Sequence, residues 1–110
     1  MAKNFGFGGG NMQSMLRQAQ KIQEEMQQAQ ETLRNTEFEG TGGGDLVKVV
    51  MTGDKNVVSV SIKPEAVDPD DIEMLEDLVT AALVDACEKV DAETARVMGP
   101  YTSMLGGGMF

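Results

Sequence analysis

The feature that most restricts the fold is an apolar seam in the first third of the chain. Apolar residues recur there at alternating steps of three and four without a break: Met12, Met15, Ala19, Ile22, Met26, Ala29 and Leu33. Because this is the heptad spacing of a coiled-coil helix and neither Gly nor Pro interrupts it, the segment predicts one long helix. A helix with so narrow an apolar stripe is marginal on its own, so we expect it to pack on another element or on a second copy of the chain.

After Phe38 the apolar period changes to two, which is the spacing of β-strands. One strand is predicted around Val47, Val49 and Met51, and the next around Val58, Val60 and Ile62. The turn-rich segments 42–45 and 53–56 are short enough to connect antiparallel neighbours. With a first, shorter strand at Phe38, the pattern predicts a three-stranded antiparallel sheet that Pro64 closes.

A second helix is predicted after Asp68-Pro69-Asp70-Asp71, with Asp68 as its N-cap and Pro69 at its first position. Its apolar face is formed by Ile72, Leu75, Leu78, Val79, Ala82, Leu83, Ala86 and Val90. Gly99-Pro100 is expected to end it. The order helix, three strands, helix predicts an α+β protein with one domain over residues 12–99. Residues 1–11 and 100–110, which are rich in glycine and lack periodicity, are expected to form a flexible arm and a flexible tail.

A chain of 110 residues supports one small core. A three-stranded sheet with free edges and a projecting helix leaves apolar surface that a second protomer can bury, so we expect a homodimer. Neither a membrane-spanning run nor a secretory signal is found in the sequence, and the single Cys87 suits a reducing compartment. These observations predict a cytoplasmic protein that does not associate with a membrane.

The net charge of −9 argues against a nucleic-acid partner, but the charge is unevenly distributed. Residues 1–36 carry four cations and three anions, a net charge of +1. Residues 68–98 carry ten acids and two cations, a net charge of −8. Only the first third of the chain can therefore approach a phosphate backbone without strong repulsion.

Side chains that carry chemistry are scarce. The chain has no histidine, and Cys87 lies among apolar residues, so it is interpreted as a packed structural thiol. The acids at positions 68–73 lack the glycine and glutamate of a calcium loop and are better explained by helix capping. The glycine triplets lack the lysine of a phosphate loop. We therefore expect no catalysis, no cofactor and no metal, and an enzyme is the least favoured hypothesis.

The polar face of the first helix carries Arg17 and Lys21 one turn apart, with Arg34 further along. Arginine and lysine can pair with phosphates, and the neighbouring glutamines can contact phosphates or base edges. Three acids, Glu24, Glu25 and Glu31, dilute this face. On composition alone it is more typical of a solvated helix surface than of a DNA-binding one.

The ordered set of segments resembles the YbaB/EbfC family of small bacterial nucleoid-associated proteins. The resemblance is carried by residues 15–23 (MLRQAQKIQ), 46–53 (LVKVVMTG), 59–62 (SVSI) and 71–86, and it extends over residues 12–99, or 88 of 110 residues. It implies an α+β fold and a homodimer shaped like tweezers, with helices that project from a central sheet. It also implies binding of double-stranded DNA with low sequence specificity, in the nucleoid, without catalysis.

On this resemblance, DNA binding is assigned to Arg17, Lys21 and Arg34, with Lys3 as a weaker candidate and Arg96 in reserve. The function implied is chromosome organisation or gene regulation. The strongly acidic second helix keeps an alternative open, in which the protein is an interaction module or adaptor for a replication or repair protein and binds DNA weakly or not at all.

Overall fold

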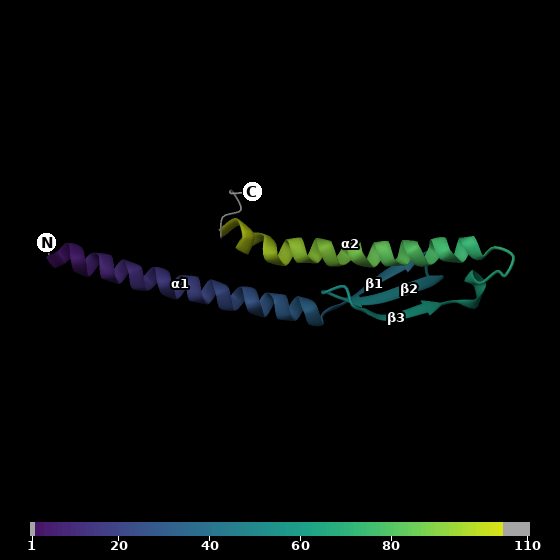
Figure 1. Cartoon of the computed structure of the whole chain (residues 1–110), viewed down its shortest axis with the longest axis horizontal. Coiled ribbons are helices and arrows are strands. Elements are labelled where there is room, and N and C mark those ends of the chain that lie inside the picture. The colour runs from purple at the N-terminus through teal and green to yellow at the C-terminus, as the bar shows by residue number, and fades with distance from the viewer. Residues whose placement is uncertain (1, 105–110) are drawn as a thin grey trace.

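The computed structural model describes the backbone of residues 2–104 and the side chains of residues 12–102 (Figure 1). The elements are α1 (Ala2–Asn35), β1 (Glu37–Gly42), β2 (Val47–Thr52), β3 (Val57–Ile62), the 3-10 helix η1 (Pro64–Ala66) and α2 (Ile72–Met104). The predicted order of helix, three strands and helix is confirmed, and only η1 is additional. The molecule extends over 85 × 25 × 16 Å because α1 projects beyond the end of α2.

Both helices are longer than predicted. α1 begins at Ala2 rather than near Met12, and α2 continues through Pro100 to Met104. Glycine lowers helix stability by about 1 kcal/mol per residue without forbidding the geometry, and a proline close to a helix end removes only one backbone hydrogen bond. The predicted helix limits were therefore wrong. The flexibility expected of residues 1–11 and 100–110 stays a prediction, and residues 1 and 105–110 lie outside the described part of the chain.

The start of α2 also differs from the prediction. Asp71 is the N-cap, because its Oδ1 accepts the backbone N–H of Met74 at 3.2 Å. Asp68 accepts the N–H of Asp70 at 2.9 Å within the preceding turn, and Pro69 lies in that turn rather than in the helix. The predicted cap at Asp68 was wrong because its carboxylate is used three residues too early to reach the first turn of α2.

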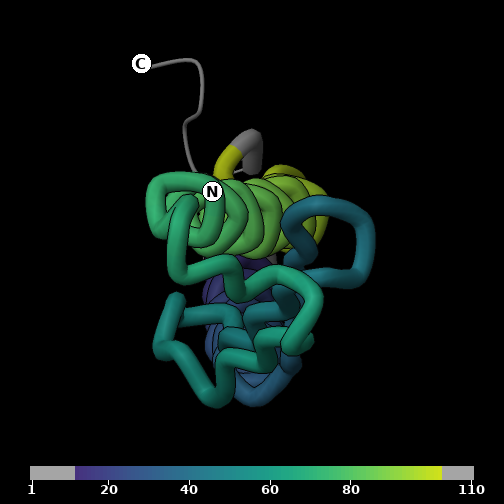
Figure 2. Tube along the Cα trace, turned by 90° about the vertical axis from the view of Figure 1, so that its right-hand side faces the viewer, coloured from purple at the N-terminus to yellow at the C-terminus, as the bar shows by residue number. Residues whose placement is uncertain are grey.

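The core lies between α2 and one face of the sheet, whose strands are antiparallel in the order β1-β2-β3. Figure 2 shows α2 above the sheet in a view along the molecule. Val47, Val49 and Met51 of β2 are fully or almost fully buried, as the alternation predicted. They form one cluster with buried residues of η1 and α2: Ala66, Ala82, Ala86 and Val90.

Two glycines of β1 let α2 approach the sheet closely. A Cβ atom at Gly40 would collide with the backbone of Ala82 and Ala86, and one at Gly42 would collide with the carbonyl of Leu78. The small side chains on both sides bring the helix backbone against the strand. This close contact places α2 over β1 and β2 and away from β3.

Two side chains of α2 cover the outer edge of β1. The backbone N–H of Thr41 donates to Asp85 Oδ2 at 2.9 Å, and Lys89 Nζ donates to the carbonyl of Glu39 at 2.7 Å. Lys89 and Asp85 also form an ion pair at 3.4 Å. Backbone groups that an edge strand would leave free are thus used within the protomer.

The Asp85 contact makes stability depend on pH. Its pKa is lowered from the ordinary value of 3.8, first by the hydrogen bond from Thr41 and then by Lys89. A carboxyl group whose pKa is depressed by folding stabilises the protein above its unfolded pKa, and this stabilisation is lost as the pH falls through the folded pKa. We expect the urea midpoint to decrease as the pH falls below the ordinary aspartate pKa of 3.8, and Asp85→Asn to flatten this decrease. Asp77→Asn, which alters an exposed acid of the same helix that is not seen to bond within the described residues, should leave the slope unchanged.

The burial of β3, the edge strand farther from α2, differs from the sequence prediction. The register places Ile62 and Val60 opposite Val47 and Val49, hence on the helix-facing side, as predicted. A register shift at Val50/Met51 then sets Val57, rather than Val58, opposite Met51. All of β3 is exposed, because α2 lies over the other two strands. The predicted apolar side of this strand is therefore not part of the protomer core.

Candidate nucleic-acid interface

Arg17 and Lys21 lie one turn apart on the part of α1 that projects from the body. Both are exposed, and neither forms an ion pair within 4.0 Å among the described residues. Such long side chains on a projecting helix can reach phosphate oxygens without first losing an internal partner. The two central site residues of the prediction are thus brought together and left accessible.

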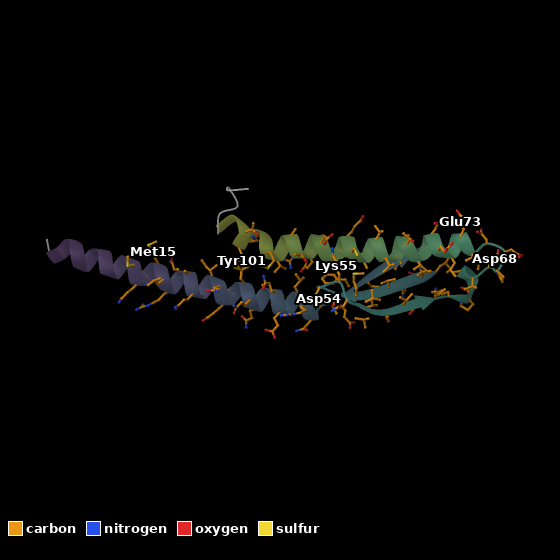
Figure 3. The ribbon with its side chains drawn as sticks, viewed as in Figure 1. Met15, Asp54, Lys55, Asp68, Glu73 and Tyr101 are labelled. Atoms are coloured by element: carbon orange, nitrogen blue, oxygen red, sulfur yellow. The ribbon has the colours of Figure 1, made fainter. Side chains whose placement is uncertain are left out.

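The apolar seam and these cations occupy opposite sides of α1. In the heptad, Met12, Met15 and their successors take positions a and d, Arg17 takes position f and Lys21 position c. Met12, Met15 and Leu16 are 65%, 67% and 60% exposed on the projecting part, where Figure 3 shows Met15. A helix that covers the seam would therefore leave the cationic side open.

Arg34 does not belong to the same patch. It lies thirteen residues after Lys21, about 20 Å along the helix, and at 3.6 residues per turn it points about 100° away from Arg17. It lines a crevice with Asp54 at the β2–β3 turn. The pKa of Asp54 is lowered, first by the hydroxyl of Thr52 and to a smaller extent by the positive charge of Arg34. Part of the positive charge of Arg34 is thereby offset by Asp54, an exposed carboxylate of the same chain.

The two weaker candidates have different settings. Lys3 lies in the first turn of α1, and its side chain is outside the described residues. Arg96 forms a two-bond contact with Glu93, from Nε at 2.9 Å and from Nη2 at 2.5 Å. This contact raises the pKa of Arg96 and lowers that of Glu93. Its charge is therefore largely offset on the surface of α2.

One cation was missed by the sequence reasoning. Of the eight Lys and Arg side chains that the structure describes, Lys48, Lys55, Lys89 and Arg96 form ion pairs with acids. The other four are Arg17, Lys21, Arg34 and Lys63. Lys63 is exposed at the end of β3, where the alternation Ser59, Ser61, Lys63 marked an outward-facing polar position. The sequence contained the signal, but it gave no reason to rank Lys63 above the cations that turn out to be paired.

Six of the ten acids of residues 68–98 lie at the far end of the molecule, before and within the first turns of α2. Asp68 and Glu73 are at the start of α2, whereas Met15 marks the projecting arm at the opposite end (Figure 3). Because exposed charges separated by more than about 10 Å are largely screened at physiological salt, this acidic end repels an anion near Arg17 only weakly. The uneven charge along the sequence is thus also a separation in space.

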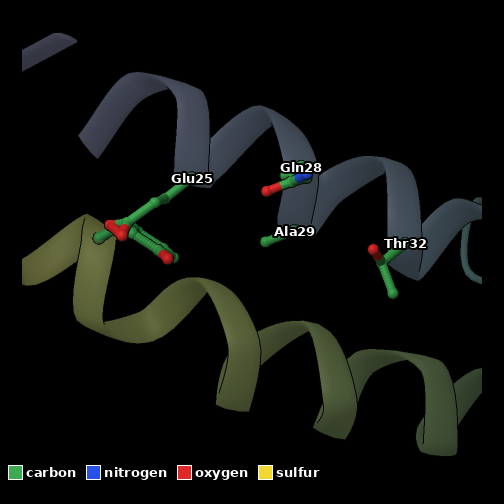
Figure 4. A pocket seen from close by; sticks show the side chains of 5 residues that line it. Glu25, Gln28, Ala29 and Thr32 are labelled. Carbon is green, nitrogen blue, oxygen red and sulfur yellow. The ribbon is translucent and has the colours of Figure 1, made fainter. Parts of the chain in front are cut away.

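Several shallow crevices lie along α1. The one in Figure 4, about 320 Å³, is lined by Glu25, Gln28, Ala29 and Thr32 of α1 and by Tyr101 of α2. It has no cation, so it does not suit an anionic ligand. Among the described residues no group of three Cys, Asp or Glu side chains is arranged to hold a metal. In the same part of the chain, no helix has the length and apolarity that a bilayer crossing needs.

Fold and charge together define the class: a small α+β protein whose long first helix presents unpaired cations away from an acidic base. The family model described as the YbaB/EbfC DNA-binding family matches residues 8–105. The chain belongs to this family, and it is a nucleoid-associated DNA-binding protein.

Named relatives agree with this assignment. A nucleoid-associated protein of Clostridium botulinum (strain Eklund 17B / Type B) is 52% identical over 105 residues, covering 96% of this chain and 93% of the relative. A nucleoid-associated protein of Ligilactobacillus salivarius (strain UCC118) is 48% identical over 99 residues, covering 90% and 95%. The names of these bacterial relatives place this type of protein at the nucleoid.

The fold also occurs among solved structures. The crystal structure of an uncharacterized protein from Helicobacter pylori matches with a TM-score of 0.64, covering 84% of this chain and 94% of that chain. At 22% sequence identity, this likeness supports the fold alone.

Proposed function

We propose that α1 is the element that contacts double-stranded DNA, with Arg17 and Lys21 as its principal phosphate-binding residues. The observation that carries this proposal is the position of these two exposed cations, without ion pairs in the described residues, on the side of α1 opposite the apolar seam. Arg34, Lys3 and Lys63 are secondary contacts further along the chain. Arg96 is not proposed as a DNA contact, because its guanidinium already forms an ion pair with Glu93.

The proposed binding is mainly electrostatic. Contacts from Lys and Arg to phosphates position a protein on DNA but do not read its sequence. The glutamines beside the cations can add hydrogen bonds to phosphates or base edges, which gives low sequence specificity. Such a protein suits chromosome organisation or the regulation of many genes in the cytoplasm, where it would act without catalysis or a cofactor.

A duplex titration tests the proposal. Fluorescence anisotropy of a labelled generic duplex should show binding at 50 mM salt that weakens by at least about tenfold at 200 mM, because phosphate contacts release counterions. A duplex of unrelated sequence and equal length should bind within about threefold. Absence of binding at low salt would contradict the assignment of α1 as a DNA-contacting surface.

We also propose that the protein acts as a homodimer through the β3 surface, defined as the exposed strand β3 together with Ile72, the first residue of α2. Val57, Val58, Val60 and Ile62 are 43–53% exposed, and Ile72 is 50% exposed. The outer edge of β3 also has no strand partner in the described chain, whereas the β1 edge is covered by Asp85 and Lys89. An apolar strand with an open edge is the kind of surface that a second copy buries.

A charge introduced on this surface should separate the protomers. We expect Val60→Asp to reduce the mass measured by light scattering from twice 11.8 kDa to 11.8 kDa, because a carboxylate would have to be buried in the interface. The control is Ser61→Asp, which alters the neighbouring residue on the opposite face of the same strand. A dimer that survives Val60→Asp but dissociates with Ser61→Asp would place the interface on the other face of the sheet.

The alternative function is an adaptor that binds a basic protein of replication or repair through the acidic end. The exposed acids before and within the start of α2, Asp68, Asp70, Asp71, Glu73, Glu76 and Asp77, favour a cationic partner. A stable complex with a basic protein after nuclease treatment, together with no duplex binding at low salt, would favour this function over the first.

A further inference from the structure

The apolar seam of α1 is covered at one end and bare at the other. Near the body, Leu33 packs against α2 and is only 8% exposed. On the arm, Met12, Met15 and Leu16 are 60–67% exposed, because α1 continues beyond the end of α2 (Figure 1). Large apolar side chains in a continuous row on a projecting helix indicate a surface that another helix covers.

We propose that the bare seam, defined as residues 12–22 and ending at the half-buried Ile22, packs antiparallel against the bare seam of α1 from another dimer. This inference rests on the proposed homodimer, because a tweezers-shaped dimer directs both arms the same way and an antiparallel partner must come from outside it. The contact would join two dimers arm to arm.

The residues that flank the seam favour a second copy as the partner. The e and g positions beside it hold Leu16, Gln18 and Gln23, so two copies meet without like charges between them. The only charges within residues 12–22, Arg17 and Lys21, lie at positions f and c on the outward side. A partner recognised by charge would find nothing to pair with on this seam, whereas an uncharged apolar helix fits it.

The antiparallel register follows from which residues are free. When Leu16 lies beside Leu16 of the second copy, Met12 lies beside its Ile22 and Met15 beside its Ala19, so the small Ala19 leaves room for a large Met15 at the centre of the contact. A longer overlap would require Ala29, which lines the crevice between α1 and Tyr101 of α2. The contact is therefore limited to about three helical turns.

So short a contact is weak between separate molecules and becomes effective when the arms are concentrated together on DNA. In the paired arms Arg17 and Lys21 still face outward, so each dimer keeps its own duplex. The arm-to-arm contact would therefore bridge two duplexes, which is an activity beyond binding one.

Disulfide trapping without DNA tests the contact and its direction. In a Cys87→Ser background, Leu16→Cys should form linked protomers at least about tenfold faster under mild oxidation than Ser14→Cys, which places the thiol on the outward side of the same turn. Met15→Cys should link more slowly than Leu16→Cys, because position d meets its own copy only in a parallel pair. Equal rates for Leu16→Cys and Ser14→Cys, or fastest linking by Met15→Cys, would overturn the proposal.

A two-duplex capture assay tests the consequence. The wild-type protein should retain a labelled duplex on beads that carry a second duplex, and the double variant Met15→Gln, Leu16→Gln should lose most of this capture while its affinity for one duplex stays within about twofold. Capture that is unchanged in the double variant would overturn the bridging role. If the wild-type protein bound no single duplex, the proposed DNA contact by α1 would be wrong instead. The disulfide result does not depend on DNA and would still test the arm-to-arm contact.

Discussion

Gly40→Val should unfold the protein or lower its free energy of unfolding by more than about 3 kcal/mol. The added side chain would enter the space occupied by the backbone of Ala82 and Ala86, and neither can move as a flexible side chain could. To relieve the overlap, α2 would have to lift from the sheet and expose Val47 and Val49, which are now fully buried. Because small domains have only about 5–15 kcal/mol of stability, this is a large fraction of the total. Urea unfolding followed by circular dichroism measures it.

Gly99→Ala is the matched control for that experiment. Gly99 lies inside α2, and a Cβ at this position would meet no atom within 4 Å apart from its chain neighbours and its own helical turn. The helical gain of about 0.5–1 kcal/mol from replacing glycine by alanine is opposed here by the ring of Pro100, so the free energy of unfolding should change by less than about 1 kcal/mol. If Gly40→Val had the same urea midpoint as the wild type, the close approach of α2 to β1 would be wrong.

The double variant Arg17→Ala, Lys21→Ala should weaken duplex binding by at least about tenfold at low salt. Each lost phosphate contact should also lower the slope of log K against log salt by about 0.9. Both side chains are exposed and bond to no acid in the described part of the chain, so the change should leave the urea midpoint almost unaltered. Anisotropy at several salt concentrations gives the affinity and the slope together.

The control variant removes the same net charge elsewhere. Lys48→Gln, Lys55→Gln eliminates two cations that are paired with Glu39 and Asp91 on the body. If binding depends on α1 rather than on total charge, this variant should retain affinity within about threefold. Arg17→Lys, Lys21→Arg should also retain most of the affinity, because it preserves both charges. If Arg17→Ala, Lys21→Ala and Lys48→Gln, Lys55→Gln lost the same amount of duplex affinity, binding would depend on total charge rather than on α1.

Much of the fold could be predicted because each element has its own period. The seam of α1 and the alternation of Val47, Val49 and Met51 depend only on local spacing, and both were found as predicted. The helix ends were less accessible to this reasoning. Glycine and proline near Gly99 and Pro100 weaken a helix by amounts that the rest of α2 can overcome, so composition there does not fix an end.

The exposure of β3 could not be deduced from its sequence. Val60 and Ile62 have the pattern of a core strand, and only the position of α2 over Gly40 and Gly42 shows that they are left uncovered. The cations posed a similar problem. Lys63 and Lys55 look alike in the sequence, but Lys55 is paired with Asp91 at 2.8 Å, and this contact depends on how α2 crosses the β2–β3 turn.

The bonds from Asp85 and Lys89 to β1 have a consequence for how far the protein can assemble through its sheet. A sheet that is open on both sides can add strands indefinitely and grow into a fibre, whereas one that is blocked on one side has a single place for a neighbour. Once that place is taken, growth stops at a closed, finite unit. Assembly through the sheet would in this way end at two protomers instead of continuing into a fibre.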